Sequence, residues 1–193
     1  MMSRLRTDTH EKEMETPERL IHEYYACEPE LERILLLHSE SVARKALRIA
    51  AAHPEWQLDA GFLREAAMLH DIGIIYTDAP GIACHGTEPY ICHGLLGAEL
   101  LRREGLPMHA RVAERHTGTG LTRQAIEAQH LPLPLRDFTP ETLVEKLICY
   151  ADKFFSKTRL DEEKTPERVI RSLERFGQES VDTFRQWNNL FTI

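Results

Sequence analysis

Apolar residues recur at the spacing of an α-helix along most of this 193-residue chain. The clearest stretch covers 30–52, where the residues at helical spacing are Leu31, Leu35, His38, Val42 and Ile49. Their separations of 4, 3, 4 and 7 place all of them on one face of a helix. Strand-like alternation of apolar and polar residues is not found in the sequence. We therefore expect an all-α fold, a single compact helical bundle of about 6–9 helices.

The tripeptide Thr-Pro-Glu marks three expected helix starts, at 16–18, 139–141 and 165–167. Thr can cap a helix N-terminus, Pro is tolerated at the first helical position, and Glu favours the positive end of the helix dipole. The last of these helices is expected to run from 165 to 188. Further helices are expected at 58–70, 93–105, 108–116 and 121–129. The boundaries expected for the chain are a flexible N-terminal arm at 1–15, a helical domain at 16–160 and a C-terminal helix at 161–193 that packs on it.

Charge and composition exclude several classes of protein. The net charge of -7 and the pI near 5.8 argue against a nucleic-acid polymer as partner, because binding to its backbone needs clustered Lys and Arg. The sequence offers neither an apolar run of about 20 residues for a membrane span nor a signal-peptide core. Its cysteines are scattered and form no C-x-x-C pair, so neither a disulfide framework nor a zinc ribbon is indicated. We expect a cytoplasmic protein with no membrane partner.

An imidazole and a carboxylate stand side by side at His70-Asp71, at the end of an apolar run. Other potential metal ligands occupy helix-like apolar settings elsewhere, at His38, His93, His116 and Asp152. A single buried His is more often an ordinary core residue, but a buried carboxylate needs a partner. Imidazole nitrogens and carboxylate oxygens suit Fe, Mn, Co, Ni or Zn. The combination favours a metal site built in the core of a helical bundle.

Five short blocks carry a resemblance to a known family. They are His38-Ser39-Glu40-Ser41-Val42-Ala43, Leu69-His70-Asp71-Ile72-Gly73, His93-Gly94 with Gly97-Ala98, His116-Thr117-Gly118 and Ala151-Asp152-Lys153. In these blocks the chain resembles the HD-domain (HDIG-type) superfamily of metal-dependent phosphohydrolases, and within it the six-ligand, dinuclear branch. The resemblance covers about residues 30–158 and implies that 16–160 form an HD-type metal-binding domain.

The resemblance also implies a ligand set and an activity. One divalent transition metal would be held by His38, His70, Asp71 and Asp152. A second would be held by His93 and His116, with Asp71 bridging the two. Asp71, His70 and Lys153 would be the catalytic residues, acting with a metal-activated hydroxide. The implied reaction is hydrolysis of a phosphoester or phosphoanhydride in a nucleotide or other small phosphorylated metabolite.

Ile74 departs from the family pattern, since many relatives carry Lys directly after His-Asp-x-Gly. Positive charge for the substrate phosphate must then come from elsewhere, and Lys153, Arg123 and Arg159 are the candidates in this sequence. His85, in the loop before His93, is a further candidate for lining the substrate pocket.

Two alternative functions stay open from the sequence. One is a di-iron HD-domain oxygenase acting on a small polar metabolite, and the other is a non-catalytic regulatory HD module. The apolar residues near the C-terminus, Phe184, Trp187, Leu190 and Phe191, could pack on the core or on another subunit. The sequence therefore leaves a homodimer open as well.

Overall fold

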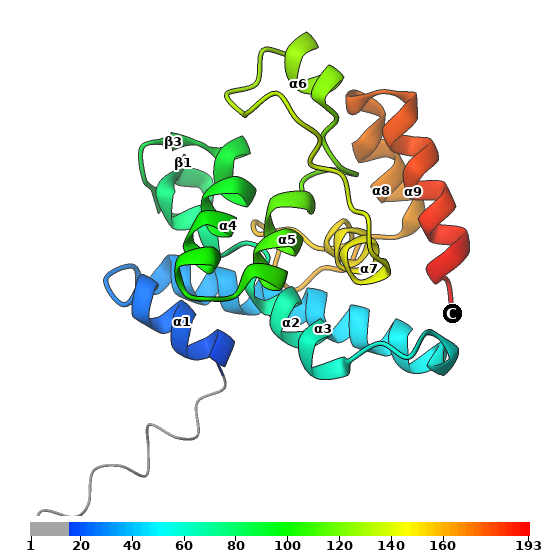
Figure 1. Ribbon diagram of the computed structural model, residues 1–193, viewed down its shortest axis with the longest axis horizontal. Helices are drawn as coiled ribbons and strands as arrows, with labels where there is room; N and C mark the ends of the chain where they lie inside the picture. Colours follow the sequence, from blue (N-terminus) through cyan, green and yellow to red (C-terminus); the bar gives the residue numbers. More distant parts are fainter. Residues whose placement is uncertain (1–15) are drawn as a thin grey trace, which may run out of the picture.

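The computed structural model describes residues 16–193 (Figure 1). The flexible arm expected at 1–15 lies outside these residues. Within them the chain forms nine α-helices, namely α1 Thr16–Tyr25, α2 Pro29–Ala52, α3 Ala60–Leu69, α4 His93–Arg103, α5 Pro107–Arg115, α6 Arg123–Ala128, α7 Leu143–Asp152, α8 Pro166–Leu173 and α9 Gln178–Phe191. The predicted helical fold class is confirmed. In this part of the chain, no helix combines the length and apolar character that crossing a bilayer requires.

Helix α2 is the longest element, and α3 and α7 pack against it, while α4 and α5 pack against each other (Figure 1). The apolar stripe predicted for α2 faces the core, since Leu35 and Val42 are fully buried and Ile49 is almost so. His38 lies in the same stripe and is 2% exposed. The helical period thus brings an imidazole into the middle of the bundle, where it needs polar partners.

A small three-stranded sheet, which the sequence analysis did not predict, lies between α3 and α4. Its strands are β1 Thr77–Ala79, β2 Cys84–His85 and β3 Glu88–Pro89, in the order β2-β1-β3. β1 pairs antiparallel with β2 and parallel with β3. Strands of two or three residues are too short to show a period-2 pattern, which is why this segment reads as a loop in the sequence. Short 3-10 helices flank the sheet: η2 Ile72–Tyr76, η3 Pro80–Ile82 and η4 Tyr90–Cys92.

The helix start predicted at 139–141 is wrong, because α7 begins at Leu143. Thr142 is its N-cap and forms a capping box with Glu145, in which the Thr142 side chain accepts from the Glu145 N–H. The Glu145 carboxylate in turn accepts from the N–H groups of Glu141 and Thr142. The backbone just before Thr139 is extended, since Phe138 pairs with Leu121 in an isolated bridge. The matching start at Thr165 is confirmed, because its side chain accepts from the Arg168 N–H.

The helix predicted to run from 165 to 188 is two helices, α8 and α9, with the 3-10 turn η5 Glu174–Phe176 between them. Gly177 adopts a φ of 98°, a left-handed conformation that ends the helical path. Helix α9 packs on α7 of the same chain, since the rings of Phe184 and Tyr150 stack with centroids 5.4 Å apart. The Tyr150 hydroxyl also donates to the Asn188 side chain at 2.9 Å. Packing on the core therefore explains why this helix carries an apolar face, formed by Val181, Phe184, Trp187 and Phe191.

Candidate metal centre

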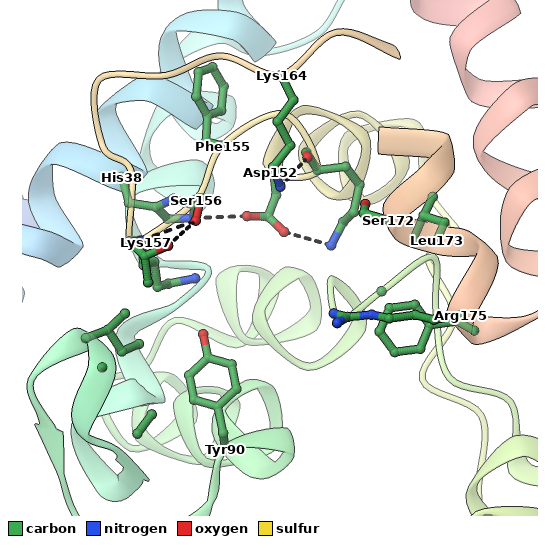
Figure 2. Close-up of a pocket in the computed structure, with 17 residues that line it drawn as sticks. His38, Tyr90, Asp152, Phe155, Ser156, Lys157, Lys164, Ser172, Leu173 and Arg175 are labelled. Carbon is green, nitrogen blue, oxygen red and sulfur yellow. Dashed lines mark hydrogen bonds and ion pairs between the residues drawn. The ribbon is translucent and has the colours of Figure 1, made fainter. Parts of the chain in front are cut away.

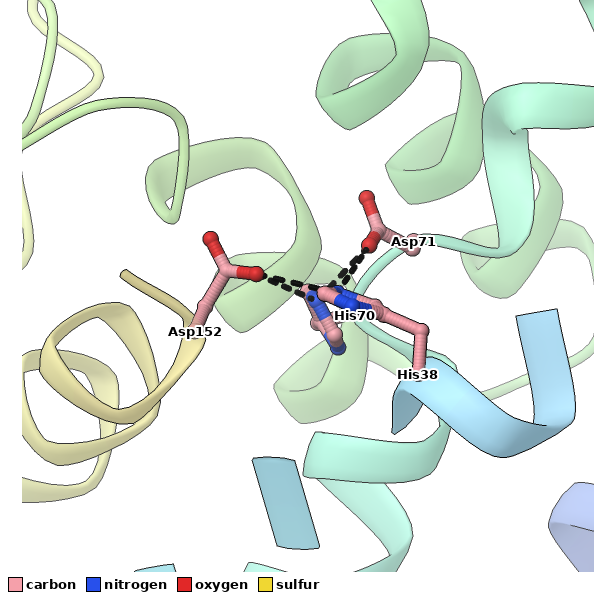
Figure 3. Close-up of side chains that lie close together, drawn as sticks. All are labelled: His38, His70, Asp71 and Asp152. Carbon is pink, nitrogen blue, oxygen red and sulfur yellow. Dashed lines mark hydrogen bonds and ion pairs between the residues drawn. The ribbon is translucent and has the colours of Figure 1, made fainter. Parts of the chain in front are cut away.

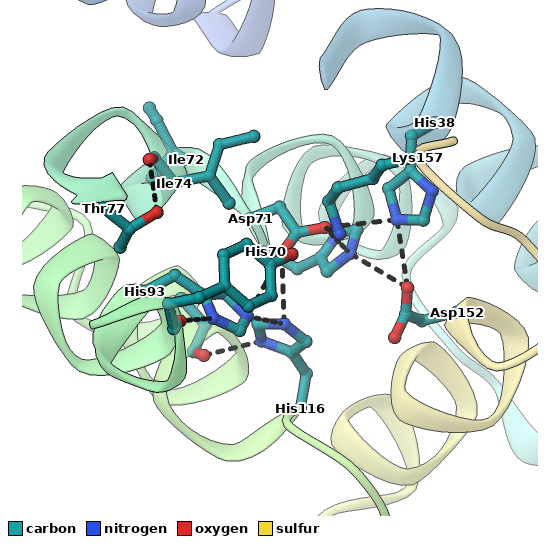
Figure 4. Close-up of polar contacts among 12 residues, drawn as sticks. His38, His70, Asp71, Ile72, Ile74, Thr77, His93, His116, Asp152 and Lys157 are labelled. Carbon is teal, nitrogen blue, oxygen red and sulfur yellow. Dashed lines mark hydrogen bonds and ion pairs between the residues drawn. The ribbon is translucent and has the colours of Figure 1, made fainter. Parts of the chain in front are cut away.

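Helix ends and one helix centre bring the predicted ligands together in the core (Figure 4). His38 projects from the middle of α2, and the pair His70-Asp71 directly follows α3. The remaining ligands are the first residue of α4, the residue after α5 and the last residue of α7, which are His93, His116 and Asp152. They form two groups that share Asp71. In each group, one ligand atom per residue lies within 4.8 Å of the others.

The first ligand group consists of His38, His70, Asp71 and Asp152 (Figure 3). The Nε2 atom of His38 lies 3.1 Å from Asp71 Oδ2 and 3.0 Å from Asp152 Oδ1. The Nε2 atom of His70 lies 2.9 Å and 3.6 Å from the same two oxygens. Two imidazole nitrogens and two carboxylate oxygens therefore surround one small volume.

The second ligand group consists of Asp71, His93 and His116. The two Nε2 atoms of His93 and His116 lie 3.0 Å apart, and each lies 3.3 Å from Asp71 Oδ1. Oδ2 of Asp71 faces the histidines of the first ligand group, so the two oxygens of the Asp71 carboxylate face different groups. This arrangement suits a carboxylate that bridges two metal ions.

Backbone carbonyls fix the orientation of three of the imidazoles. In each case Nδ1 lies 2.6–2.7 Å from the carbonyl oxygen of the residue three positions earlier, which pairs His70 with Ala67, His93 with Tyr90 and His116 with Ala113. Such a carbonyl accepts a hydrogen bond from Nδ1–H, which assigns the lone pair of a neutral ring to Nε2. Each of these rings thus directs its Nε2 atom into the ligand groups.

The donor set fits metal cations. In the second ligand group, two neutral Nε2 atoms and the charged Asp71 Oδ1 face one another with no proton between them, an arrangement that a cation would stabilise. Asp71 Oδ1 is buried, and no N–H or O–H group donates to it in the described structure, which is costly inside a protein. Nitrogen and oxygen donors of this kind suit Fe, Mn, Co, Ni or Zn.

The protonation states of the ligand side chains also indicate a site for cations. Burial lowers the pKa of His93 to about 3 and also lowers that of His116, so both rings are neutral at pH 7. Burial also disfavours a charged His70, but Asp71 and Asp152 outweigh it and raise the His70 pKa to about 9. Burial raises the pKa of Asp71, yet His70 and Lys157 hold it well below its usual range. A buried carboxylate that stays ionised needs positive charge beside it.

The predicted substrate and catalytic residues are placed in different surroundings. Lys153 lies at the centre, with Nζ 2.8 Å from Asp152 Oδ2. His85 is exposed in β2, and Arg123 is exposed at the start of α6. Arg159 is exposed and pairs with Glu162. None of these last three lines either cavity that adjoins the ligand groups in the described structure.

Sequence reasoning missed Lys157, whose Nζ lies 2.5 Å from Asp71 Oδ2 (Figure 4). Its side chain is only 12% exposed. In the sequence it is a Lys in a polar segment after a helix, which normally indicates a solvated surface charge. Its position five residues after Asp152 was the available signal, because a chain leaving the end of α7 starts at the metal centre.

Two cavities adjoin the ligand groups. The first, called here the lysine cavity, has a volume of about 460 Å³ and is lined by His38, Asp152, Lys153, Lys157 and Lys164 among others (Figure 2). A larger cavity of about 820 Å³ reaches His93 and is lined by residues of the 117–122 segment and of α9. Tyr90, Gly118, Arg175 and Phe176 line both cavities. Both volumes are in the range of small-molecule sites.

Comparison with known families agrees with this site. The model of the HD domain family matches residues 35–156, most of the chain. The chain therefore belongs to the HD-domain family, and its His/Asp cluster is consistent with a metal site of that family. The solved HD domain of the phosphodiesterase PgpH from L. monocytogenes has a similar fold, with a TM-score of 0.52 over 90% of this chain and 95% of that domain. At 17% identity this likeness concerns the fold alone.

Curated relatives include longer proteins. A tRNA (cytidine(56)-2'-O)-methyltransferase of Picrophilus torridus is 35% identical over 66% of this chain and 33% of its own length. A protein of the same name from Thermoplasma volcanium is 31% identical over 76% of this chain and 38% of its length. An uncharacterized protein of Methanocaldococcus jannaschii is 37% identical over 63% of this chain and 66% of its length. The chain thus spans about a third of the methyltransferases that it matches.

Proposed function

We propose that this protein is a metal-dependent phosphohydrolase that cleaves a phosphoester or phosphoanhydride bond in a nucleotide or other small phosphorylated metabolite. The observation that carries the proposal is Asp71, whose two oxygens face two groups of metal-ligating side chains. The lysine cavity opens beside His38 and Asp152 of the first ligand group. A site with paired ligand groups and a cationic cavity is suited to an anion that must be bound and attacked at phosphorus.

The residues of the chain have distinct tasks in this reaction. Metals held by the two ligand groups would supply a water of lowered pKa and positive charge against the phosphoryl oxygens. Lys153 holds Asp152 through its 2.8 Å contact, and so orients a ligand carboxylate. Lys164 lines the same cavity and adds charge that favours an anionic substrate. Tyr90, at the border of both cavities, limits the space in which a substrate can lie.

The comparisons support hydrolysis in a limited way. The HD-domain family is part of a phosphohydrolase superfamily, and the similar solved domain comes from a protein described as a phosphodiesterase. The methyltransferase names describe whole proteins of which the matched stretch is about a third. A cluster of imidazoles and carboxylates is typical of metal-assisted hydrolysis, so we carry over hydrolysis and not methyl transfer.

A substrate panel tests the proposal. Protein stripped with a chelator and reloaded with Mn, Fe, Co, Ni or Zn would be assayed for phosphate or nucleotide release from phosphomonoesters, phosphodiesters and nucleoside polyphosphates. We expect turnover that falls at least 100-fold in Asp71→Asn, as expected for loss of a metal-bridging group, while the exposed His85→Ala keeps wild-type turnover. Metal-loaded protein that releases nothing, or an Asp71→Asn variant as active as wild type, would refute the proposal. Oxygen uptake by iron-loaded protein would instead indicate the oxygenase alternative.

A further inference from the structure

We infer that Lys157 is the residue that binds the substrate phosphate at the metal centre, and that in the metal-free protein it holds the place of a cation on Asp71. The inference rests on the proposed function for the identity of the anion. It places the phosphate-binding charge in the segment after α7. Many relatives carry a Lys directly after His-Asp-x-Gly, but in this chain that position, in η2, is Ile74. Ile74 is fully buried and has no charge to offer.

The contact between Lys157 and Asp71 involves an oxygen that the metal ligands also approach. Lys157 Nζ lies 2.5 Å from Asp71 Oδ2, and the Nε2 atoms of His38 and His70 lie 3.1 Å and 2.9 Å from that oxygen. A metal ion in the first ligand group would therefore stand close to the ammonium. Two positive charges repel strongly where little water screens them. Metal binding and the present position of Lys157 thus compete.

A lysine displaced from Asp71 needs another anion. Among residues 16–193, Asp71 is the only carboxylate within ion-pair distance of Lys157. The side chain lines the lysine cavity, and the Tyr90 hydroxyl points toward it across that cavity (Figure 2). The four-carbon stem of Lys allows its ammonium to turn from the carboxylate into the cavity. An anion held there would lie beside both the metals and Lys157.

The other lysines of the cavity are held differently. Lys153 Nζ contacts Asp152 Oδ2 at 2.8 Å and the His116 carbonyl oxygen at 3.4 Å. Lys164 Nζ contacts the Lys153 carbonyl oxygen at 3.4 Å and touches no ligand carboxylate. Phosphate is a compact anion that can reach a metal and an ammonium at the same time, and Lys binds it as a point charge. Lys157 is therefore placed for the phosphoryl oxygens nearest the metals.

Binding measurements without turnover test the inference. Chelator-stripped protein would be titrated with Mn²⁺, and Mn²⁺-loaded protein with inorganic phosphate, both by isothermal titration calorimetry. In Lys157→Met we expect the Mn²⁺ affinity to rise and the phosphate affinity to fall by about tenfold or more, the equivalent of one lost charged contact. Lys157→Arg should recover part of the phosphate affinity. A residue that only supports the fold would not move the two affinities in opposite directions.

Lys164→Met is the matched comparison, because it removes a lysine of the same cavity that does not touch a ligand carboxylate. It should leave the Mn²⁺ affinity unchanged. The inference is overturned if Lys157→Met binds phosphate as wild type does, if its Mn²⁺ affinity falls, or if loaded wild-type protein binds no phosphate. Circular dichroism of each variant would show whether it is folded. If Lys157→Met does not fold, the affinities of Lys157→Arg still decide the test. Failure of the substrate panel alone would refute the proposed reaction and leave these affinities to decide the role of Lys157.

Discussion

His93 begins α4 and His116 follows α5, yet their Nε2 atoms lie only 3.0 Å apart. Both rings donate through Nδ1 to backbone carbonyls, so the two facing atoms carry lone pairs. The close packing of α4 on α5 brings these atoms together. The two histidines of the second ligand group consequently come from one helix pair, and Asp71 after α3 completes the group, while the first ligand group draws on α2, α3 and α7.

We therefore predict that the two metals can be removed separately. His93→Ala should lower the metal content of Mn-loaded protein from two ions per chain to about one, because the first ligand group stays complete. Metal analysis of the gel-filtered protein measures this ratio. The exposed His85→Ala is the control and should keep both ions. A His93→Ala variant with full metal content would contradict the assignment of the second ligand group.

The stability of the metal-free protein should fall as the pH rises from 6.5 to 9. The pKa of His70 is raised from 6.5 to about 9, so its protonated form stabilises the fold fully below pH 6.5 and is lost through pH 9. At about 1.4 kcal/mol per pH unit this is on the order of 3 kcal/mol. Thermal unfolding of chelated and metal-loaded protein across this range measures the effect.

The metal-loaded protein is the control. A metal on His70 Nε2 replaces the proton there, so His70 no longer contributes to the pH dependence of stability. The metal affinity should rise over the same range as the competing proton is lost. If the difference in Tm between the chelated and the loaded protein stays constant from pH 6.5 to 9, the assignment of a protonated His70 in the metal-free protein is contradicted.

Gly73→Ala should destabilise the protein by about 3 kcal/mol, at the upper end for an overpacked core. A Cβ added at Gly73 would lie 2.2 Å from the His93 carbonyl oxygen and 2.3 Å from the Gly97 nitrogen. The backbone of α4 would have to move, and His93 with it, so the metal content should fall too. Urea unfolding and metal analysis measure the two effects. Gly81→Ala is the control, because a Cβ there meets no atom within 4 Å.

Thr142→Ala should cost about 1 kcal/mol, the usual value of a helix N-cap. The side chain of Thr142 accepts from the Glu145 N–H at the start of α7, the helix that ends in Asp152. Thr139→Ala, at the start suggested by the sequence, should cost less than about 0.5 kcal/mol because it caps no helix. Urea unfolding of the two variants measures both losses of stability. A larger loss in Thr139→Ala than in Thr142→Ala would contradict the observed capping box.

Much of the helical framework could be predicted because helix periodicity is a local property. The spacing from Leu31 to Ile49 predicted both α2 and the buried position of His38. His38, His93, His116 and Asp152 could be singled out beside His70-Asp71 because polar groups in apolar helix faces need partners. Their division between two metals is implied by the resemblance to the HD-domain superfamily. The structure brings all six proposed ligands into the two groups.

The remaining features depend on contacts between distant parts of the chain. The choice of Thr142 over Thr139 depends on Glu145 and on the bridge between Phe138 and Leu121. The contact of Lys157 with Asp71 could not be predicted from periodicity, because the segment around Lys157 has none and Asp71 is far away in sequence. The short sheet is likewise held by pairing between segments too brief to have a pattern.

The contact between His38 and Asp152 joins chain positions 114 residues apart. A metal held by both would act as a cross-link between α2 and α7, and closing so long a loop removes much of the freedom of the unfolded chain. The unfolded chain cannot present this ligand set, so the binding free energy of the metal adds to the stability of the fold. Loss of the metal would then weaken the resistance of the whole domain to unfolding and proteolysis, together with its chemistry.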